Sequence, residues 1–258
     1  MTYAVAHDGS VIRHEIRGSG PTLMCLAPRG PRGPLGAPSR ALVARMTEAL
    51  APHLRVVFVD YPGVPKPRTL TPEAVVDDLL RVADAVEADR FAWWGYSWGG
   101  AVGLRLAASS ERVGALVCGG FPPLEGPYPG LLRLSHSVHR LSTRLHLPRR
   151  VRNSAEQWVT FYAANQGIEL RDAERALAMP RLCFVGERDR TQLGRRELFS
   201  IADIVTRGRE DLEQVGWDVN VLPGLTHPGA MRPDAFLPVV APWLLEHWAT
   251  PAADRSAS

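Results

Sequence analysis

The sequence is poor in cysteine, with only three among its 258 residues. Cys25, Cys118 and Cys183 each lie within an apolar run that is typical of a buried strand. Their odd number and their spacing fit neither a disulfide framework nor a metal-binding motif. We therefore expect reduced cysteines in the core of a cytoplasmic protein whose activity needs no metal ion or organic cofactor.

The sequence also lacks a strong net charge and any long apolar segment. A formal net charge of +3 is too small to indicate nucleic acid as the main partner. No apolar run approaches the length that spans a bilayer. The first residues, MTYAVAHDGS, lack the basic and apolar regions of a signal peptide. We expect no nucleic-acid binding, no stable membrane insertion, and a frayed tail over residues 251–258.

Short apolar strands alternate with helical patterns along most of the chain. After an N-terminal β region, the strands TLMCLA, VVFVD, FAWWG, RVGALVCGG, RLCFVGE and WDVNVLPG are separated by stretches with helical spacing. One of these stretches, residues 195–214, is predicted as a single helix. The alternation predicts an α/β fold with a doubly wound, mostly parallel sheet that carries helices on both faces.

An all-helical insertion interrupts this alternation after the sixth predicted strand, over residues 121–179. Its apolar residues recur at three- and four-residue steps, which predicts an amphipathic helix: Leu131, Leu134, Val138, Leu141 and Leu145. A second helical stretch, SAEQWVTFYAANQ, follows. We predict that the insertion is a lid over the edge where open α/β sheets bind ligands. Residues 1–120 and 180–250 would then form the two parts of the core.

A serine held between glycines follows the bulky strand FAWWG. Residues 95–99 read G-Y-S-W-G, a G-x-S-x-G motif between a predicted strand and a predicted helix. In that context Ser97 lies on a sharp, strained turn, and the glycines let strand and helix approach without Cβ clashes. The helix N-terminus behind it favours developing negative charge. Ser97 could instead only cap the helix, but the context favours a nucleophile.

A reactive serine needs a base that takes its proton and an acid that orients this base. Of the eight histidines, only His227 occupies a loop after a late predicted strand. Asp189 follows the preceding strand, and the chain order Ser, Asp, His is the one expected with this motif. Glu187 is the alternative acid. We favour Asp189 because it lies further past the strand, where the loop can turn toward the histidine.

With these residues, the chain resembles the α/β-hydrolase family over about residues 3–249. The resemblance rests on the turn at GYSWGG, the turn GERD, the histidine loop THPGAMRP and the helical insertion. It implies that Ser97 is the nucleophile, that His227 is the general base and acid, and that Asp189 is the orienting acid.

The resemblance also implies an oxyanion hole made of two backbone N–H groups. Trp98 would supply one of them. Family members usually have His-Gly after the third strand, where this chain has A-P-R at residues 27–29. Arg29 would then supply the second N–H, although a shift in register would place Pro31 there, which has no N–H to donate. The guanidinium of Arg29 could instead pair with a substrate anion.

Aromatic residues bracket the predicted nucleophile. Because side chains alternate along a strand, Trp93 and Trp94 should lie on opposite faces of the sheet and pack under helices. Tyr96 and Trp98 are closer to the reacting centre. Tyr96 is predicted to contact the substrate, with packing around the turn as the alternative.

The predicted lid combines an apolar stripe with positive charge. We expect the stripe to face inward, so that Leu134, Val138 and Leu141 contact an apolar or aromatic small-molecule substrate. Residues 131–152 also hold six arginines, three histidines and no acidic residue. This charge fits an anionic substrate, an acidic carrier protein or a membrane surface. The alternative, which the sequence favours, is a simple solvated helix face.

Three functions follow from these patterns. The leading hypothesis is a serine-dependent hydrolase that cleaves an ester, thioester or lactone of an apolar small molecule through an acyl-enzyme. A second hypothesis uses the same triad for acyl transfer, a lyase reaction or cyclisation. A third is a ligand-binding protein without a reaction, because a fold by itself does not establish a function. The ordered Ser, Asp and His favour the first hypothesis.

Overall fold

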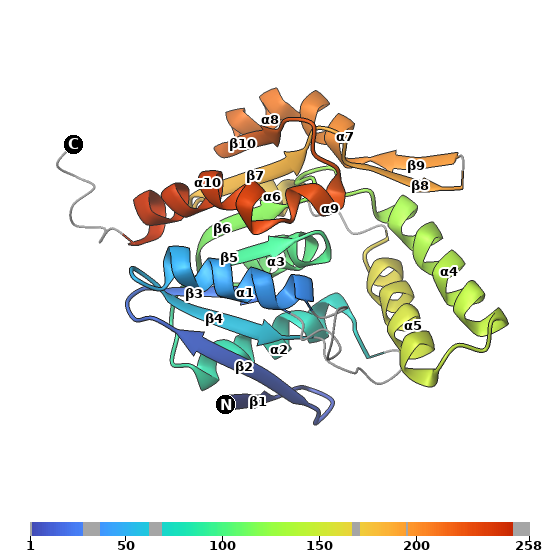
Figure 1. The fold of residues 1–258 in the computed structure, drawn as a ribbon, viewed down its shortest axis with the longest axis horizontal. Helices are drawn as coiled ribbons and strands as arrows, with labels where there is room; N and C mark the ends of the chain where they lie inside the picture. The colour runs from blue at the N-terminus through green and yellow to red at the C-terminus, as the bar shows by residue number, and fades with distance from the viewer. Residues whose placement is uncertain (1, 28–36, 62–68, 167–170, 195, 250–258) are drawn as a thin grey trace.

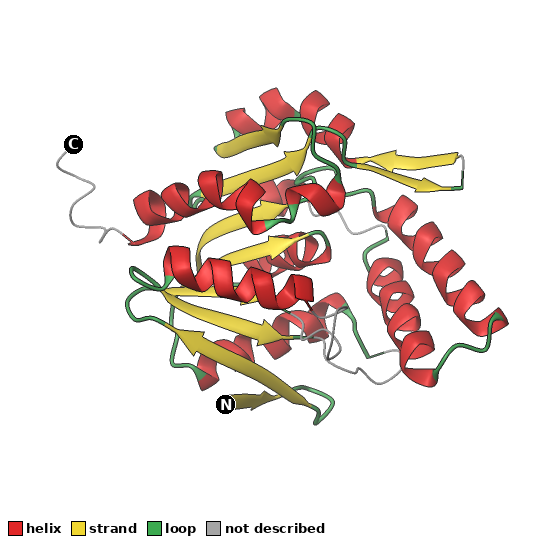
Figure 2. Ribbon diagram, viewed as in Figure 1, coloured by secondary structure: helices red, strands yellow, loops and turns green. Residues whose placement is uncertain are grey.

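The computed structural model describes residues 2–27, 37–61, 69–166, 171–194 and 196–249. Within these ranges an eight-stranded sheet forms the centre of the molecule, in the order β1-β2-β4-β3-β5-β6-β7-β10 (Figures 1 and 2). Its strands are β1 (Thr2–Val5), β2 (Val11–Arg17), β3 (Thr22–Leu26), β4 (Arg55–Asp60), β5 (Phe91–Tyr96), β6 (Val113–Gly119), β7 (Arg181–Gly186) and β10 (Trp217–Leu222). Within this sheet only the pairs β1/β2 and β2/β4 are antiparallel.

Helices cover both faces of this sheet. Helices α1 (Ala37–Leu50) and α10 (Pro233–Leu244) contact each other on one face, and α2 (Pro72–Ala85) and α3 (Trp98–Ser109) do so on the other. In Figure 1, α1 and α10 lie in front of the strands and α2 and α3 lie behind them. The structure thus confirms the doubly wound, mostly parallel α/β fold. In the described part of the chain, none of the helices combines the length and apolar character needed to cross a membrane.

The central strands are apolar because they are buried on both faces, as expected of a parallel sheet. Every residue of β5 is buried, and Trp93 and Trp94 belong to the core clusters on opposite faces. This confirms the alternation predicted for the two tryptophans. The three cysteines are free and buried in these two clusters, with Cys25 in one and Cys118 and Cys183 in the other.

Capping residues determine where the surrounding helices begin. Thr71 Oγ1 accepts a hydrogen bond from the Ala74 N–H at 3.2 Å, and Pro72 occupies the first position of α2. Ser200 acts in the same way on α7 (Ile201–Arg207), because its Oγ accepts the Asp203 N–H at 3.1 Å. A side-chain acceptor thus replaces the carbonyl that each helix start lacks.

The helix predicted for residues 195–214 is wrong in its first part. Strands β8 (Arg190–Leu193) and β9 (Arg196–Ser200) form an antiparallel hairpin, and the helical region is divided into α7 and α8 (Arg209–Gln214). The cap at Ser200 prevents an earlier helix start. In addition, the Phe199 ring packs so closely on Gly130 that a Cβ there would lie 2.4 Å from it. Because Phe199 and Gly130 are far apart in the chain, the local spacing of apolar residues cannot predict this contact.

The insertion between β6 and β7 is helical. It contains α4 (Tyr128–Arg144), α5 (Arg149–Ala164) and the short α6 (Arg171–Arg175). Helices α4 and α5 pack against each other. They lie on the side of the molecule toward which the parallel strands point (Figure 1).

The apolar stripe of α4 does not face inward along its whole length. Leu131 packs against the core and Leu134 is half-buried, but Val138 and Leu141 are 46% and 56% exposed. The inward orientation expected for Val138 and Leu141 is therefore wrong. The N-terminal half of α4 lies over the core, whereas its C-terminal half extends beyond it.

Candidate active site

Ser97 occupies a strained turn between β5 and α3. Its backbone has φ 55° and ψ −118°, in the region that residues with a side chain rarely adopt. Gly95 makes the turn possible, because a Cβ at this position would lie 2.0 Å from the Gly99 carbonyl oxygen. A Cβ at Gly99 would make only an ordinary contact, 3.5 Å from Leu26. The expected close approach thus holds for the first glycine of the motif and not for the second.

Backbone and side-chain hydrogen bonds hold this turn. The Ser97 N–H donates to the Gly119 carbonyl at 2.7 Å, which ties the turn to the end of β6. The indole of Trp93 donates to the Gly99 carbonyl at 3.0 Å. Trp98 is the first residue of α3, and N–H groups at a helix start have no acceptor within the helix. Its N–H can therefore bind an anionic oxygen near Ser97.

His227, the first residue of the short helix α9 (His227–Ala230), and Asp189, in the turn after β7, are brought together at the end of the sheet. His227 Nδ1 lies 2.7 Å from Asp189 Oδ2. The Asp189 side chain is fully buried, and its other carboxylate oxygen has no hydrogen-bond partner in the described part of the chain. Because a buried carboxylate is stabilised only by its partners, the His227 ring is held firmly in this orientation.

The alternative acid, Glu187, makes a different contact. Its Oε2 accepts the Gly224 N–H at 2.6 Å, so it supports the turn after β10 rather than the histidine. Asp189 is turned inward by local bonds, since its N–H donates to the Gly186 carbonyl at 3.0 Å.

The side chain of Tyr96 is buried and contacts the segment that carries His227, so it supports the packing predicted as the alternative role. Its hydroxyl donates to the His227 carbonyl at 2.7 Å, and its ring centroid lies 5.0 Å from that of His227. Burial, together with the charge of Asp189, raises the pKa of the Tyr96 hydroxyl well above its usual range, so the donor stays protonated. Since Tyr96 directly precedes Ser97, it connects the serine turn to the histidine.

Two features predicted for the site are not seen in the part of the chain that the structure describes: a bond between Ser97 and His227, and the second donor of the oxyanion hole. Among the described residues, no hydrogen bond links Ser97 Oγ to His227. Such bonds are often long without a substrate and tighten when it binds. Arg29, predicted for the oxyanion hole, and Pro31, its alternative, lie outside the described residues.

An aromatic cluster lies beside the serine and joins α3 to the insertion. The Trp98 ring meets Trp158 of α5 edge-on at 4.8 Å and Phe161 at 5.5 Å, and it stacks on Tyr61 at 6.2 Å. The residue patterns did not single out Trp158 and Phe161 as part of the site. Their three-residue spacing in SAEQWVTFYAANQ marks one face of a helix, but spacing does not identify the partner of that face.

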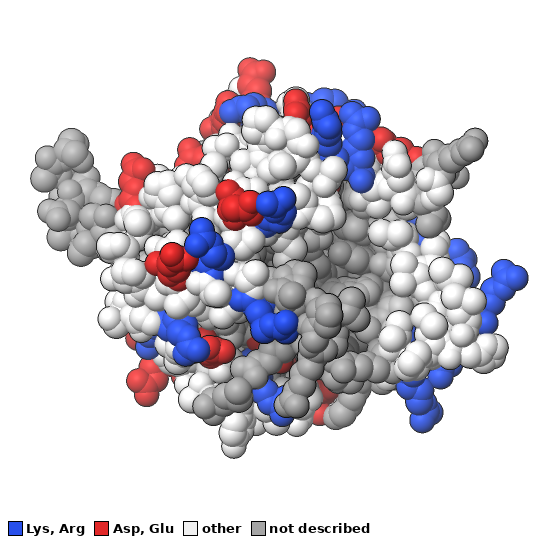
Figure 3. All heavy atoms as spheres, in the orientation of Figure 1, with Lys and Arg blue, Asp and Glu red and all other residues white. Residues whose placement is uncertain are grey.

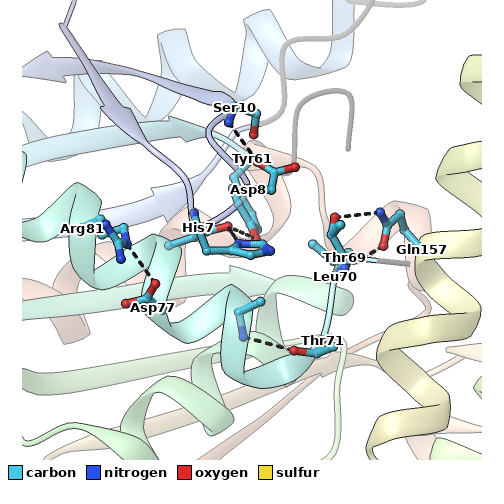
Figure 4. A network of polar contacts seen from close by, with 12 residues as sticks. His7, Asp8, Ser10, Tyr61, Thr69, Leu70, Thr71, Asp77, Arg81 and Gln157 are labelled. Atoms are coloured by element: carbon cyan, nitrogen blue, oxygen red, sulfur yellow. Dashed lines mark hydrogen bonds and ion pairs between the residues drawn. The ribbon is translucent and has the colours of Figure 1, made fainter. Parts of the chain in front are cut away.

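A polar contact ties the same helix to the loop before α2 (Figure 4). The side chain of Gln157 accepts the Leu70 N–H at 2.7 Å and donates to Thr69 Oγ1 at 3.1 Å. The neighbouring Tyr61 hydroxyl donates to the buried carboxylate of Asp78 at 2.8 Å, and His7 bonds the same carboxylate. These bonds fix the positions of Tyr61 and of helix α5, whose side chains contact the Trp98 ring.

A buried carboxylate joins the two ends of the insertion. Glu174, in α6, is only 3% exposed, and its Oε2 accepts the Leu124 N–H at 2.5 Å. Leu124 has φ 65°, and this bond supports its strained backbone. Burial raises the pKa of Glu174 to about 7, despite the Leu124 N–H and the charge of Arg105, which both lower it.

We expect stability to fall as the pH rises, because of Glu174. The folded protein holds this proton up to about pH 7, whereas the unfolded chain releases it near pH 4.5. The stabilisation is complete below the lower value and is lost as the pH rises through the higher one. Glu174→Gln keeps the acceptor for Leu124 and removes the charge. The gain in the free energy of unfolding of Glu174→Gln over the wild type should therefore be about 1–3 kcal/mol larger at pH 8 than at pH 5.

Urea unfolding of both proteins at pH 5 and pH 8 measures this difference. Glu111→Gln is the matched control, because Glu111 is exposed. An identical pH dependence of unfolding in Glu174→Gln and the wild type would contradict the expectation.

The described residues contain no group of three or more His, Cys, Asp or Glu side chains that could hold a metal ion. What they do offer is a His–Asp pair that Tyr96 connects to the strained turn of Ser97, with a helix N-terminus and an aromatic cluster next to that turn.

A family model described as "Alpha/beta hydrolase family" matches residues 33–239 of this chain. RutD of Rhizobium rhizogenes, whose name attributes carbamate hydrolysis to it, is 35% identical over 80 residues. This match covers 29% of the chain and 30% of the relative. RutD of Agrobacterium fabrum is 31% identical over 71 residues, which covers 26% of the chain and 27% of the relative. The chain thus matches less than a third of the length of these curated relatives.

Solved structures match over nearly the whole chain. An enol-lactonase of Burkholderia xenovorans LB400 has a TM-score of 0.63 and 22% identity, covering 94% of this chain and 99% of that one. An esterase of Thermogutta terrifontis has a TM-score of 0.66 and 18% identity, with 95% and 98% coverage. A hydrolase of Pseudomonas aeruginosa has a TM-score of 0.67 and 18% identity, with 96% and 98% coverage. At these identities the likeness shows the fold.

Proposed function

This chain belongs to the alpha/beta hydrolase family, and we propose that it is a serine hydrolase acting on an ester, thioester or lactone of an apolar small molecule. One observation carries the proposal. The ring of His227, held 2.7 Å from the buried carboxylate of Asp189, lies against Tyr96, the residue directly before the strained Ser97. A serine, a base and an orienting acid of this kind are what nucleophilic acyl transfer requires.

In the first half of the reaction, Ser97 Oγ attacks the substrate carbonyl while His227 Nε2 takes its proton. The carbonyl oxygen becomes negatively charged, and the Trp98 N–H at the start of α3 stabilises it. When the tetrahedral intermediate collapses, His227 returns the proton to the leaving alcohol, thiol or ring oxygen. Asp189 keeps the imidazole oriented and stabilises its positive charge.

In the second half, water replaces the leaving group. His227 takes a proton from the water, the resulting oxygen attacks the acyl carbon, and a second tetrahedral intermediate forms. Its collapse returns the proton to Ser97 Oγ and releases the carboxylic acid. The aromatic cluster around Trp98 supports an apolar or aromatic acyl or leaving group, since such surfaces favour apolar ligands.

A fluorophosphonate probe tests the proposal, because it phosphonylates only a serine activated by a base. We expect intact-mass and peptide mapping to place one adduct on Ser97 of the wild type and none on Ser97→Ala. His227→Ala should label far more slowly. An adduct on another residue, or a folded wild type that stays unlabelled, would contradict the proposal.

A panel of esters, thioesters, lactones and carbamates with small and aromatic groups then measures substrate preference. Carbamates are included because of the name of the two RutD relatives. Product analysis distinguishes hydrolysis from the alternatives that use the same triad. A free acid with one oxygen from labelled water indicates hydrolysis, whereas a new ester or a cyclic product indicates transfer or cyclisation.

A further inference from the structure

The free end of the α4–α5 hairpin presents large apolar side chains to solvent. Val138, Leu141 and Leu145 follow one another at three- and four-residue steps and thus share one face of α4. Leu147 and Val151 lie in the connection and in the first turn of α5. We call these five residues the apolar tip. They are 36–58% exposed.

This exposure is concentrated rather than scattered. Of the nine large apolar residues that are exposed in the described part of the chain, five belong to the apolar tip. Single exposed leucines are common in proteins, whereas a cluster of them marks an interaction site. Backbone bonds also fix its shape, since the Leu147 N–H donates to the Ser142 carbonyl and closes the connection tightly at 3.0 Å.

Exposed arginines lie on the same two helices as the apolar tip. Arg133, Arg140, Arg144 and Arg149 are exposed, and none forms a salt bridge with another described residue. No acidic residue occurs in the whole segment 131–152. On the face drawn in Figure 3, basic atoms project at the edge formed by α4 and α5, and no acidic atoms accompany them there.

We propose that the apolar tip and its arginines dock reversibly on the surface of an anionic lipid bilayer. Lipid phosphates would pair with the arginines, and the leucines would enter the boundary between headgroups and acyl chains. Neither part alone would hold the protein, but together they provide the two signals that stable peripheral binding requires. The docking does not depend on the proposed hydrolase activity.

The charge disfavours a second copy of this chain as the partner, because two tips of the same sign repel each other. An acidic protein would satisfy the arginines. However, the apolar tip forms the protruding end of a hairpin (Figure 1), and a fluid bilayer can mould itself around such a shape. Charge and exposed apolar surface together therefore favour lipid.

Vesicle co-sedimentation tests this inference. We expect the wild type to bind vesicles of phosphatidylcholine with phosphatidylglycerol about tenfold or more tightly than vesicles of phosphatidylcholine alone. Raising the salt from about 0.05 M to about 0.5 M should weaken the binding strongly, because it screens exposed charges.

Two double variants separate the two contributions. Leu141→Ser with Leu145→Ser removes apolar contact, and Arg140→Gln with Arg144→Gln removes charge; each should reduce binding about tenfold. Val11→Ser and Arg207→Gln are the matched controls, because these residues are exposed elsewhere on the surface, and they should bind like the wild type. Thermal unfolding confirms that each variant is folded.

Three outcomes would overturn the inference: a wild type without preference for anionic vesicles, tip variants that bind as well as the controls, or a loss of binding in the arginine variant alone. Binding to polyglutamate with none to vesicles would indicate an acidic protein instead.

Discussion

Replacing Ser97 by alanine should lower kcat by about 10⁴-fold or more, with a much smaller change in KM. The hydroxyl is the only group that the substitution removes. Both the His227–Asp189 pair and the turn should remain, because the Ser97 backbone is held by Gly119 and the close approach at Gly95 is unchanged. Steady-state kinetics on the best substrate of the panel measures the effect.

Ser110→Ala is the matched control for this experiment. Ser110 is the C-cap of α3, at the opposite end of the helix from Ser97, and its side chain accepts a hydrogen bond from the Arg112 N–H at 3.3 Å. Its loss should affect stability slightly and kcat very little. If Ser97→Ala retained more than about a hundredth of the wild-type rate, another nucleophile would be needed and the proposed mechanism would be wrong.

Asp189→Asn should lower kcat by about 10⁴-fold while the fold stays intact. The substitution is isosteric, but it removes the negative charge that stabilises a protonated His227. The asparagine amide also favours the other tautomer of the imidazole, with the proton on Nε2, so that Nε2 can no longer accept the proton of Ser97. Because Asp189 is fully buried, water cannot replace the lost charge. Kinetics over pH 5–9 measures the loss.

Glu187→Gln is the control that separates the two candidate acids. Its Oε2 accepts the Gly224 N–H, and the glutamine oxygen can do the same. We therefore expect less than about a threefold change in kcat. A large loss in Glu187→Gln together with a small one in Asp189→Asn would assign the orienting role to Glu187 instead.

Residue patterns predicted the parts of this protein that depend on local chemistry. Strands that are apolar throughout indicated a parallel sheet, and the structure confirms both the sheet and the split of Trp93 and Trp94 between its faces. The motif around Ser97 predicted a strained turn, which its positive φ shows. Chain order suggested Asp189 and His227, which lie in contact. Each of these patterns is set by neighbours in the sequence or by the topology of alternating strands and helices.

The helical insertion shows where such patterns stop being informative. Three- and four-residue spacing correctly indicated a helix around Leu134, but Val138 and Leu141 face solvent. Periodicity identifies an apolar face without identifying what covers it, and α4 extends beyond the core that would have buried its end. The same limit explains the β8–β9 hairpin, where Phe199 packs on Gly130 of a distant helix.

The sequence by itself therefore determined the fold class, the strained serine and the order of the candidate triad. Only the tertiary structure decided that Tyr96 holds the histidine loop, that Trp158 and Phe161 pack on Trp98, and that Glu174 joins the ends of the insertion. Periodicity and turn chemistry act over a few residues, whereas these contacts join segments that are far apart in the chain. Their formation depends on how the sheet and the insertion pack together, which local preferences do not specify.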